Sequence, residues 1–202
     1  MTGNDNFDPD DPNDVERLIA TNVRPWNSFW SWRDKPIGEQ GVAREITAAA
    51  GLKVEDLVSR ENRDPPDCEA TVDGRWTGIE VTELVHQKTL ERSLKALKER
   101  AAGNEPYRPE AYFNWEKDDL ISILQAQIDQ KDKAQLKGGP YERYILVIHT
   151  DEFFLQSETV ERFLAGTVFR ASMITDAILG LSYEPKLGRC PAFPLTIVRS
   201  YA

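Results

Sequence analysis

Two acidic residues, Asp67 and Glu80, have the spacing that would let them act together in chemistry. They lie thirteen positions apart in the run PPDCEATVDGRWTGIEVTEL, on either side of Asp73-Gly74. Asp-Gly is among the best two-residue hairpin turns because both positions tolerate positive φ. Pairing residues outward from this turn sets Asp67 opposite Glu80 on one face of a hairpin, with Cβ atoms roughly 4.5–5.5 Å apart. Such a pair can share Mg²⁺ (or Mn²⁺), since Mg²⁺ is typically held by one or two carboxylates together with water and substrate oxygens.

The residues around Glu80 indicate how the hairpin is oriented. Ile79 and Val81 alternate with Glu80 and belong in a core, so we interpret this stretch as a half-buried strand. Like charges directly opposed there destabilise a sheet unless a cation, a proton or a basic side chain lies between them. Glu69 and Thr82 project from the same face as the two acids, and Glu69 would extend the acidic cluster. The alternative is a solvent-exposed hairpin edge, where acids are common and carry no function.

These residues also carry a family resemblance. Pro66-Asp67, the hairpin and Glu80-Val81-Thr82 resemble the motif of the PD-(D/E)xK nuclease superfamily, and the run as a whole is similar to uncharacterised bacterial members. In that superfamily a helix bears an acid, one strand has Asp after Pro, and the next strand ends in Glu-x-Lys. The resemblance covers about residues 37–150 in the order of elements and residues 66–82 in the specific motif.

The resemblance implies roles for particular side chains. Asp67 and Glu80 would be metal ligands, and an acid on the preceding helix, Glu39 or Glu45, would join them. The sequence does not choose between these two glutamates. It departs from the family pattern at Thr82, which occupies the lysine position. In the family that lysine orients the attacking water and stabilises the charge that develops on phosphate, and threonine carries no positive charge with which to do so.

Lys131 is the candidate that would supply the missing charge. Residues 117–136 have the pattern of a helix with an apolar stripe, formed by Leu120, Leu124 and Ile128. At about 100° per residue, Gln127 and Lys131 fall inside this stripe. One interpretation is that Lys131 replaces the lysine missing from position 82. The other is that its stem packs on apolar surface while the ammonium reaches solvent near the helix C-terminus. Lys88 is a poorer candidate because nothing fixes its direction.

The elements that would position these side chains alternate between helix and strand. Helical patterns cover residues 37–50, 88–101, 117–136 and 157–169. Strand-like runs, besides the hairpin, cover residues 144–150, 172–183 and 194–200. We therefore predict an α/β fold with a mixed central sheet flanked by helices. The resemblance implies, more specifically, a restriction-endonuclease-like core (helix, hairpin, helices, strand) with C-terminal additions.

Composition bounds the class of protein. The chain has 202 residues, of which 40% are hydrophobic and 29% charged, an ordinary globular balance. We expect an acidic disordered tail over residues 1–25 and a single domain over residues 26–202. No apolar run approaches the roughly 20 residues of a membrane-spanning helix and no basic-then-apolar leader opens the chain, so we expect a cytoplasmic protein. Cys68 and Cys190 are too few for a disulfide scaffold and are predicted to be free thiols.

Charge and aromatic content bear on partners. The formal net charge of −9 counts against tight nonspecific binding to nucleic acid, which usually relies on surplus Lys and Arg. It does not exclude a local basic cleft, or a metal that supplies positive charge. The aromatic segment Trp26–Trp32 is interpreted as a clasp over the core, with an exposed patch for a protein partner as the alternative.

The pattern as a whole predicts a metal-dependent phosphodiester hydrolase (nuclease) of the PD-(D/E)xK type, acting on DNA or RNA. Asp67, Glu80 and Lys131 would be its catalytic residues, and Asp67 and Glu80 would hold Mg²⁺ or Mn²⁺. One alternative is a degenerate, non-catalytic nuclease-fold module for binding or scaffolding, which Thr82 and the net charge favour. A third hypothesis is a protein–protein interaction partner.

Overall fold

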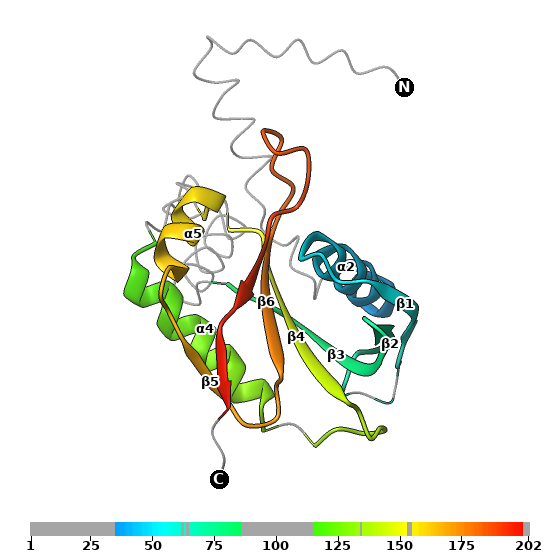
Figure 1. The fold of residues 1–202 in the computed structure, drawn as a ribbon. Helices are drawn as coiled ribbons and strands as arrows, with labels where there is room; N and C mark the ends of the chain where they lie inside the picture. Colours follow the sequence, from blue (N-terminus) through cyan, green and yellow to red (C-terminus); the bar gives the residue numbers. More distant parts are fainter. Residues whose placement is uncertain are drawn as a thin grey trace, which may run out of the picture. The chain divides into compact units, whose positions relative to one another are not determined.

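A mixed six-stranded sheet forms the centre of the fold, with strands in the order β1-β2-β3-β4-β6-β7 (Figure 1). The computed structural model describes residues 35–61, 63, 65–85, 115–133, 135–152 and 155–199. The sheet strands are β1 Val54–Ser59, β2 Cys68–Val72, β3 Arg75–Glu83, β4 Arg143–Thr150, β6 Asp176–Leu181 and β7 Ala192–Leu195. The pairs β3–β4 and β4–β6 are parallel, and the other pairs are antiparallel. The predicted α/β fold with a mixed sheet flanked by helices is therefore confirmed.

The hairpin of β2 and β3 has the predicted turn and register. Asp73 and Gly74 both have positive φ, 50° and 78°, as a two-residue hairpin turn of this kind requires. The ladder pairs Val72 with Arg75 and continues to the pair Cys68–Ile79. Asp67 is the next residue outward and so stands across from Glu80. The turn itself is held by Asp73, whose carboxylate accepts a hydrogen bond from the Lys53 amide and pairs with Arg143.

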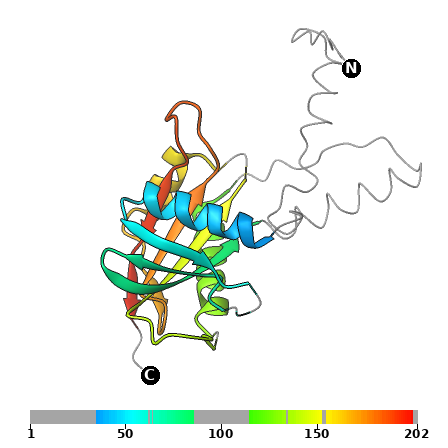
Figure 2. The ribbon, with the colours of Figure 1, turned by 90° about the vertical axis from the view of Figure 1, so that its right-hand side faces the viewer.

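Helix α2 (Lys35–Ala49) covers one face of the sheet, as Figure 2 shows. Its buried residues pack against the inward side chains of strands β1, β2, β3, β4 and β6, among them Ile79, Val81 and Ile145. Gly180 on β6 permits a close approach of α2, because a Cβ at this position would lie 2.3 Å from Ile46 Cδ1. This is the face from which Glu80 and Thr82 point away.

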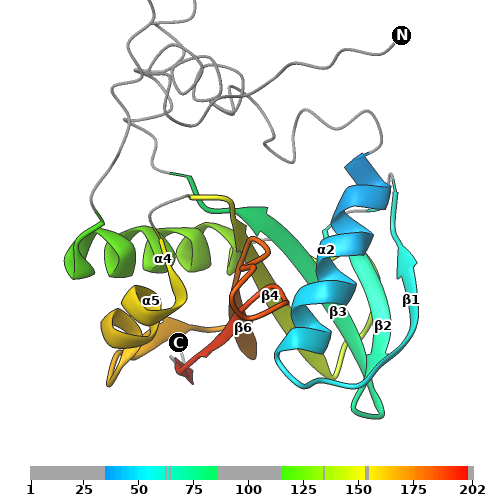
Figure 3. The ribbon, with the colours of Figure 1, turned by 90° about the horizontal axis from the view of Figure 1, so that it is seen from above.

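Helices α4 (Lys117–Lys131) and α5 (Ser157–Leu164) lie on the opposite face, so the sheet is enclosed between two layers (Figure 3). Three fully buried residues of α4, Leu120, Leu124 and Ile128, form the predicted apolar stripe. A small parallel sheet of β5 (Phe169–Ala171) and β8 (Ile197–Arg199) packs beside α4. Glu80 and Thr82 therefore face α4.

Several predicted boundaries are wrong, for local reasons. Helix α4 ends at Lys131, where the Asp132 carboxylate accepts hydrogen bonds from three amides of the β5–β6 loop. Helix α5 ends at Leu164, near Gly166 with its φ of 70°, and residue 169 already begins β5. The predicted strand 172–183 is confined to β6, and the predicted strand 194–200 is divided between β7 and β8.

Two features of the first elements differ from expectation. Strand β1 was not predicted, because a bulge between Glu55 and Val58 and a positive φ at Asp56 interrupt its alternation. On α2, Ile37 is 65% exposed, although its spacing from Val42 and Ile46 predicts a place in an apolar stripe. The buried stripe contains polar Glu39 and Thr47 instead.

Other expectations concern residues outside the described ranges. These are the tail 1–25, the Trp26–Trp32 segment, Lys88 and the helix over 88–101. Cys68 and Cys190 are free cysteines, as predicted. Among the described residues, no helix is long and apolar enough to cross a membrane.

Candidate active site

Asp67 and Glu80 meet inside the protein, on the face of the sheet that α4 covers. Asp67 is 7% exposed and Glu80 is 4% exposed. Asp67 Oδ2 accepts a hydrogen bond of 2.8 Å from the amide of Val81, which fixes the Asp67 carboxylate against the strand that carries Glu80. The alternative interpretation, in which Asp67 and Glu80 lie on a solvent-exposed edge of the hairpin, is wrong, because both carboxylates are buried.

Glu80 is held in an environment that disfavours its charge. Burial, and then the charge of Asp67, raise the pKa of Glu80 to about 7, while the Lys131 ammonium acts in the opposite direction. Glu80 Oε1 accepts a hydrogen bond of 2.5 Å from Lys131 Nζ. Glu80 Oε2 is buried without a hydrogen-bond partner among the described residues. One oxygen of this carboxylate is therefore satisfied by a cation and the other is unsatisfied.

Lys131 reaches Glu80 because α4 runs antiparallel to β3 with matching spacing. Thr82 Oγ1 donates a hydrogen bond of 3.1 Å to Gln127 Oε1, one turn before the Lys131–Glu80 contact. Four residues of a helix rise about 6 Å, and two residues of a strand about 6.7 Å. Gln127 and Lys131 are therefore matched to Thr82 and Glu80. The Lys131 side chain is 24% exposed, so its ammonium lies at the boundary between the carboxylates and solvent.

Gln127 lies one step along the strand from the acids. Its amide nitrogen is 3.5 Å from the carbonyl oxygen of Glu83, so the side chain spans from Thr82 to the end of β3. Gln127 thus ties α4 to β3 through Thr82 and Glu83. Within the described residues, the cation bonded to Glu80 is Lys131.

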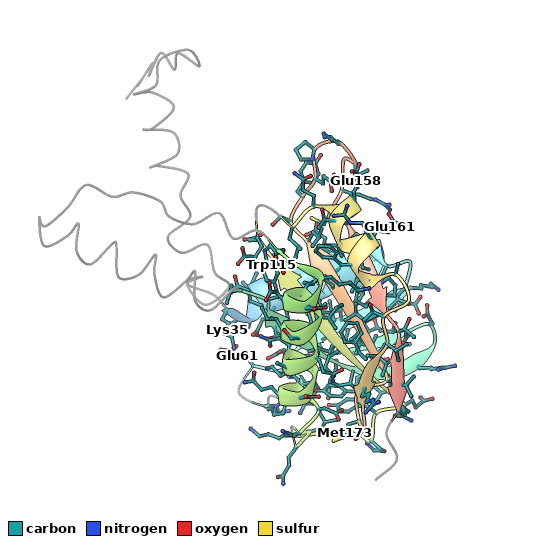
Figure 4. All side chains as sticks on the ribbon, turned by 90° about the vertical axis from the view of Figure 1, so that its left-hand side faces the viewer. Lys35, Glu61, Trp115, Glu158, Glu161 and Met173 are labelled. Carbon is teal, nitrogen blue, oxygen red and sulfur yellow. The ribbon has the colours of Figure 1, made fainter. Side chains whose placement is uncertain are left out.

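Of the two helix acids, the structure brings Glu39 towards the pair. Glu39 is buried on α2, and its charge contributes to the raised pKa of Glu80 and of Cys68. It pairs with Lys35 at 2.9 Å, at the start of the helix, where Lys35 is labelled in Figure 4. Glu45 is exposed and interacts with the Cys190 thiol. Of the two glutamates, Glu39 is the buried one and the one whose charge acts on Glu80, and its membership of the site stays a prediction.

Glu69 does not extend the acidic cluster. Its carboxylate accepts hydrogen bonds from the Arg60 guanidinium and from the Tyr141 hydroxyl. Arg60 also binds the backbone carbonyl of Lys137, which joins the loop before β2 to the loop before β4. Gly78 leaves space between these loops, because a Cβ there would lie 3.0 Å from Pro66 Cγ. Glu69 therefore helps to hold these two loops together beside the site.

One buried residue near the acids was missed by sequence reasoning. Tyr144 on β4 is 3% exposed, and its hydroxyl has no hydrogen-bond partner among the described residues. It pairs with Gly78 in the parallel ladder and so stands two residues from the partner of Glu80. Only the β3–β4 register reveals this proximity, and no short motif signals it.

The site could hold a divalent cation through two protein ligands, the carboxylates of Asp67 and Glu80. Within the described ranges, no group of three or more His, Cys, Asp or Glu side chains is arranged to hold a metal ion. Asp67 and Glu80 supply hard oxygen ligands, and the unpartnered Glu80 Oε2 is the atom most in need of a partner. This donor set suits Mg²⁺ or Mn²⁺ better than zinc, which prefers nitrogen and sulfur.

Comparison with known proteins adds no relative to this description. The chain matched no protein-family model, no curated protein and no solved structure.

Proposed function

We propose that the chain is a metal-dependent phosphodiester hydrolase of the PD-(D/E)xK type, a nuclease acting on DNA or RNA. One observation carries this proposal. Two buried carboxylates lie together, Asp67 just before β2 and Glu80 on β3, and Glu80 binds the ammonium of Lys131 from helix α4. The element order also supports it, since an acid-bearing helix, a hairpin, a helix and a parallel strand follow one another as α2, β2–β3, α4 and β4. A restriction-endonuclease-like core is part of this proposal.

The metal would be held by Asp67 and by Glu80 through its unpartnered Oε2. When bound, Mg²⁺ or Mn²⁺ supplies a Lewis acid for the phosphoryl oxygen and lowers the pKa of water. Other groups of the protein would hold the two metal ligands in position. Asp67 is kept in place by the Val81 amide, and Glu80 is kept in place by Lys131.

Lys131 would perform the role of the lysine that Thr82 replaces. An ammonium has three donor protons, and the Glu80 contact requires one of them. The remaining donors would bind the attacking water or a phosphoryl oxygen and stabilise the negative charge that develops there. The partial exposure of Lys131 gives a substrate approaching from solvent access to this ammonium.

A second candidate is a non-catalytic binding or scaffold module with the same fold. The Lys131–Glu80 contact favours it, because a lysine that neutralises a buried carboxylate takes over part of the role of a metal. The net charge of −9 favours it as well. In this case the acids and Lys131 would be an internal ion cluster.

Metal binding is tested first, by thermal unfolding with and without Mg²⁺ or Mn²⁺. Binding to the folded state alone raises stability by about 2.7 kcal/mol at a hundredfold excess over Kd, which corresponds to roughly 5–11 °C in Tm for a chain of this size. We expect this rise in the wild type and its loss in Asp67→Asn and Glu80→Gln. Glu45→Gln is the matched control, since Glu45 is an exposed acid that interacts with Cys190. An unchanged Tm in the wild type would contradict the metal site.

Cleavage is tested second, with Mn²⁺ and with single- and double-stranded DNA and RNA. We expect cleavage by the wild type and a loss of about 10²–10³ in kcat for Lys131→Met, the size seen when a charge-stabilising donor is removed. A wild type that binds metal but cleaves none of these substrates would favour the non-catalytic module. Equal cleavage by the wild type and by Asp67→Asn would refute the proposed site.

A further inference from the structure

Two buried oxygens on the α4 face of the sheet lack hydrogen-bond partners among the described residues. They are Glu80 Oε2 and the hydroxyl of Tyr144. An unsatisfied buried polar group costs about 1–3 kcal/mol, and in native proteins such atoms usually bind a water or an ion. Because these two oxygens lie on the same face of the sheet, one bound water or ion could contact both.

The sheet register places both residues around the same position. Tyr144 pairs with Gly78, and Leu146 pairs with Glu80, so Tyr144 and Glu80 are diagonal neighbours on adjacent parallel strands. Strand spacing and rise put their Cα atoms roughly 8 Å apart, within the reach of an aromatic side chain. Asp67 lies on the other side of Glu80, immediately before β2. Glu80 is thus flanked by Asp67 and Tyr144, with Lys131 above it.

The hydroxyl is in the field of the two acids without bonding to either. Burial, followed by the charges of Glu80 and Asp67, raises the pKa of Tyr144 above its ordinary value. The hydroxyl therefore keeps its proton at neutral pH and remains a hydrogen-bond donor. A neutral donor here differs from Lys131, because it would bind an oxygen without neutralising a carboxylate.

We propose that the Tyr144 hydroxyl donates a hydrogen bond to an oxygen bound at the Asp67–Glu80 pair. This inference rests on the proposed function, and it adds a binding group that the family resemblance does not assign. The oxygen belongs either to a water that enters with the divalent cation or to a phosphoryl group. Each has lone pairs that can accept a hydrogen bond from the hydroxyl, and separate arms of one experiment distinguish them.

The first measurement is stability without metal, in EDTA, for three Tyr→Phe variants. Tyr144→Phe removes a hydroxyl that lacks a partner, so its Tm stays equal to the wild-type value or rises. Tyr141→Phe removes a hydroxyl bonded to Glu69, so its Tm falls by about 2–4 °C. Tyr183→Phe alters an exposed tyrosine and leaves the Tm unchanged. A fall for Tyr144→Phe as large as that for Tyr141→Phe would overturn the inference.

The second measurement is the Tm gained on adding Mg²⁺ alone, and Mg²⁺ with inorganic phosphate. Losing one hydrogen bond to the bound oxygen weakens binding about three- to tenfold in Tyr144→Phe. A smaller gain than the wild type with Mg²⁺ alone identifies the oxygen as that of water. A gain that is equal with Mg²⁺ but smaller with added phosphate identifies it as phosphoryl oxygen.

The remaining outcomes separate this inference from the proposed function. If the wild type and Tyr144→Phe gain equally in both arms, the role of Tyr144 is wrong and the proposed metal site stands. If Mg²⁺ raises the Tm of neither protein, with or without phosphate, the metal site is wrong and the inference fails with it. Tyr183→Phe must follow the wild type in both arms.

Discussion

Lys131 Nζ lies 2.5 Å from Glu80 Oε1, and this contact joins residues that are 51 positions apart in the chain. It connects the last residue of α4 to the middle of β3, the strand on which the candidate site is built. The contact both supplies a cation to a buried carboxylate and fixes the end of a helix. Its loss therefore has consequences for stability as well as for the proposed chemistry.

Lys131→Met should reduce stability, because it keeps the apolar stem and removes the cation beside Glu80. We expect a loss of about 1–3 kcal/mol at pH 8, where Glu80 would be charged and unpaired. At pH 5 the loss should shrink, since Glu80 is then protonated and no longer needs the ammonium. Urea unfolding at both pH values measures this. A loss that is the same at pH 5 and pH 8 would show that the ammonium does not act through Glu80.

The raised pKa of Glu80 gives the metal-free protein a particular pH dependence. The carboxyl titrates at about 7 in the folded protein and at 4.5 in its ordinary state, so between these values the native state binds more protons than the unfolded state. The free energy of unfolding should therefore decrease as pH rises from about 4.5 to about 7. Comparing wild type with Glu80→Gln in EDTA isolates this contribution, because the variant lacks the titrating group. A difference between the two proteins that does not vary with pH would contradict it.

Asp132 should stabilise the protein by holding the end of α4. Its carboxylate accepts hydrogen bonds from the amides of Ser172, Met173 and Ile174, and Met173 is labelled near that end in Figure 4. Burial opposes the charged form of Asp132, but these amides outweigh it and lower the pKa. Asp132→Ala should cost about 1–3 kcal/mol at pH 7.

The lowered pKa of Asp132 also predicts how the effect of Asp132→Ala on stability changes at acidic pH. Since the folded pKa of Asp132 lies below its ordinary value of 3.8, the stabilisation is present above that value and is lost as pH falls through the folded pKa. The difference between wild type and Asp132→Ala should therefore narrow in acid. Asp129→Ala, in the last turn of α4, is a suitable control, because among the described residues Asp129 accepts a hydrogen bond from a side-chain amide, that of Gln125, and from no backbone amide of another element.

Gly180→Ala should destabilise the α2 face. The new Cβ would lie 2.3 Å from Ile46 Cδ1 and 2.6 Å from Cγ1, and Ile46 is itself buried. Overpacking of this kind costs about 1–3 kcal/mol. Ile46→Val removes Cδ1 and should recover part of the loss in the double variant, which denaturant unfolding would reveal. Gly41→Ala, at a helix position with open space, should instead stabilise by up to about 1 kcal/mol.

Local patterns were sufficient for the hairpin and for the face of α4. Asp73-Gly74 determines the turn, and the side-chain alternation then places Asp67 and Glu80 without further information. Helical periodicity placed Lys131 on the buried side of α4, and only its contact with Glu80 required coordinates. Both inferences rely on regular geometry within one element or one turn.

Features that depend on contacts between residues far apart in the chain could not be predicted. Tyr144 reaches the site only because β4 is parallel to β3 in a particular register, and a sequence does not state that register. The sequence did not choose between Glu39 and Glu45, because the buried face of α2 contains polar residues, which obscure its periodicity. Strand β1 was missed because its bulge interrupts the alternation on which strand prediction depends.

The matched spacing of α4 and β3 makes the candidate site vulnerable to slippage between helix and strand. Sliding α4 by one turn would bring Lys131 opposite Thr82 and leave Glu80 without a cation, while the apolar contacts would still repeat every turn. The hydrogen bonds of Asp132 to the β5–β6 loop oppose such a shift. Asp132, which has no role in the proposed chemistry, thus keeps Lys131 aligned with the carboxylate of Glu80.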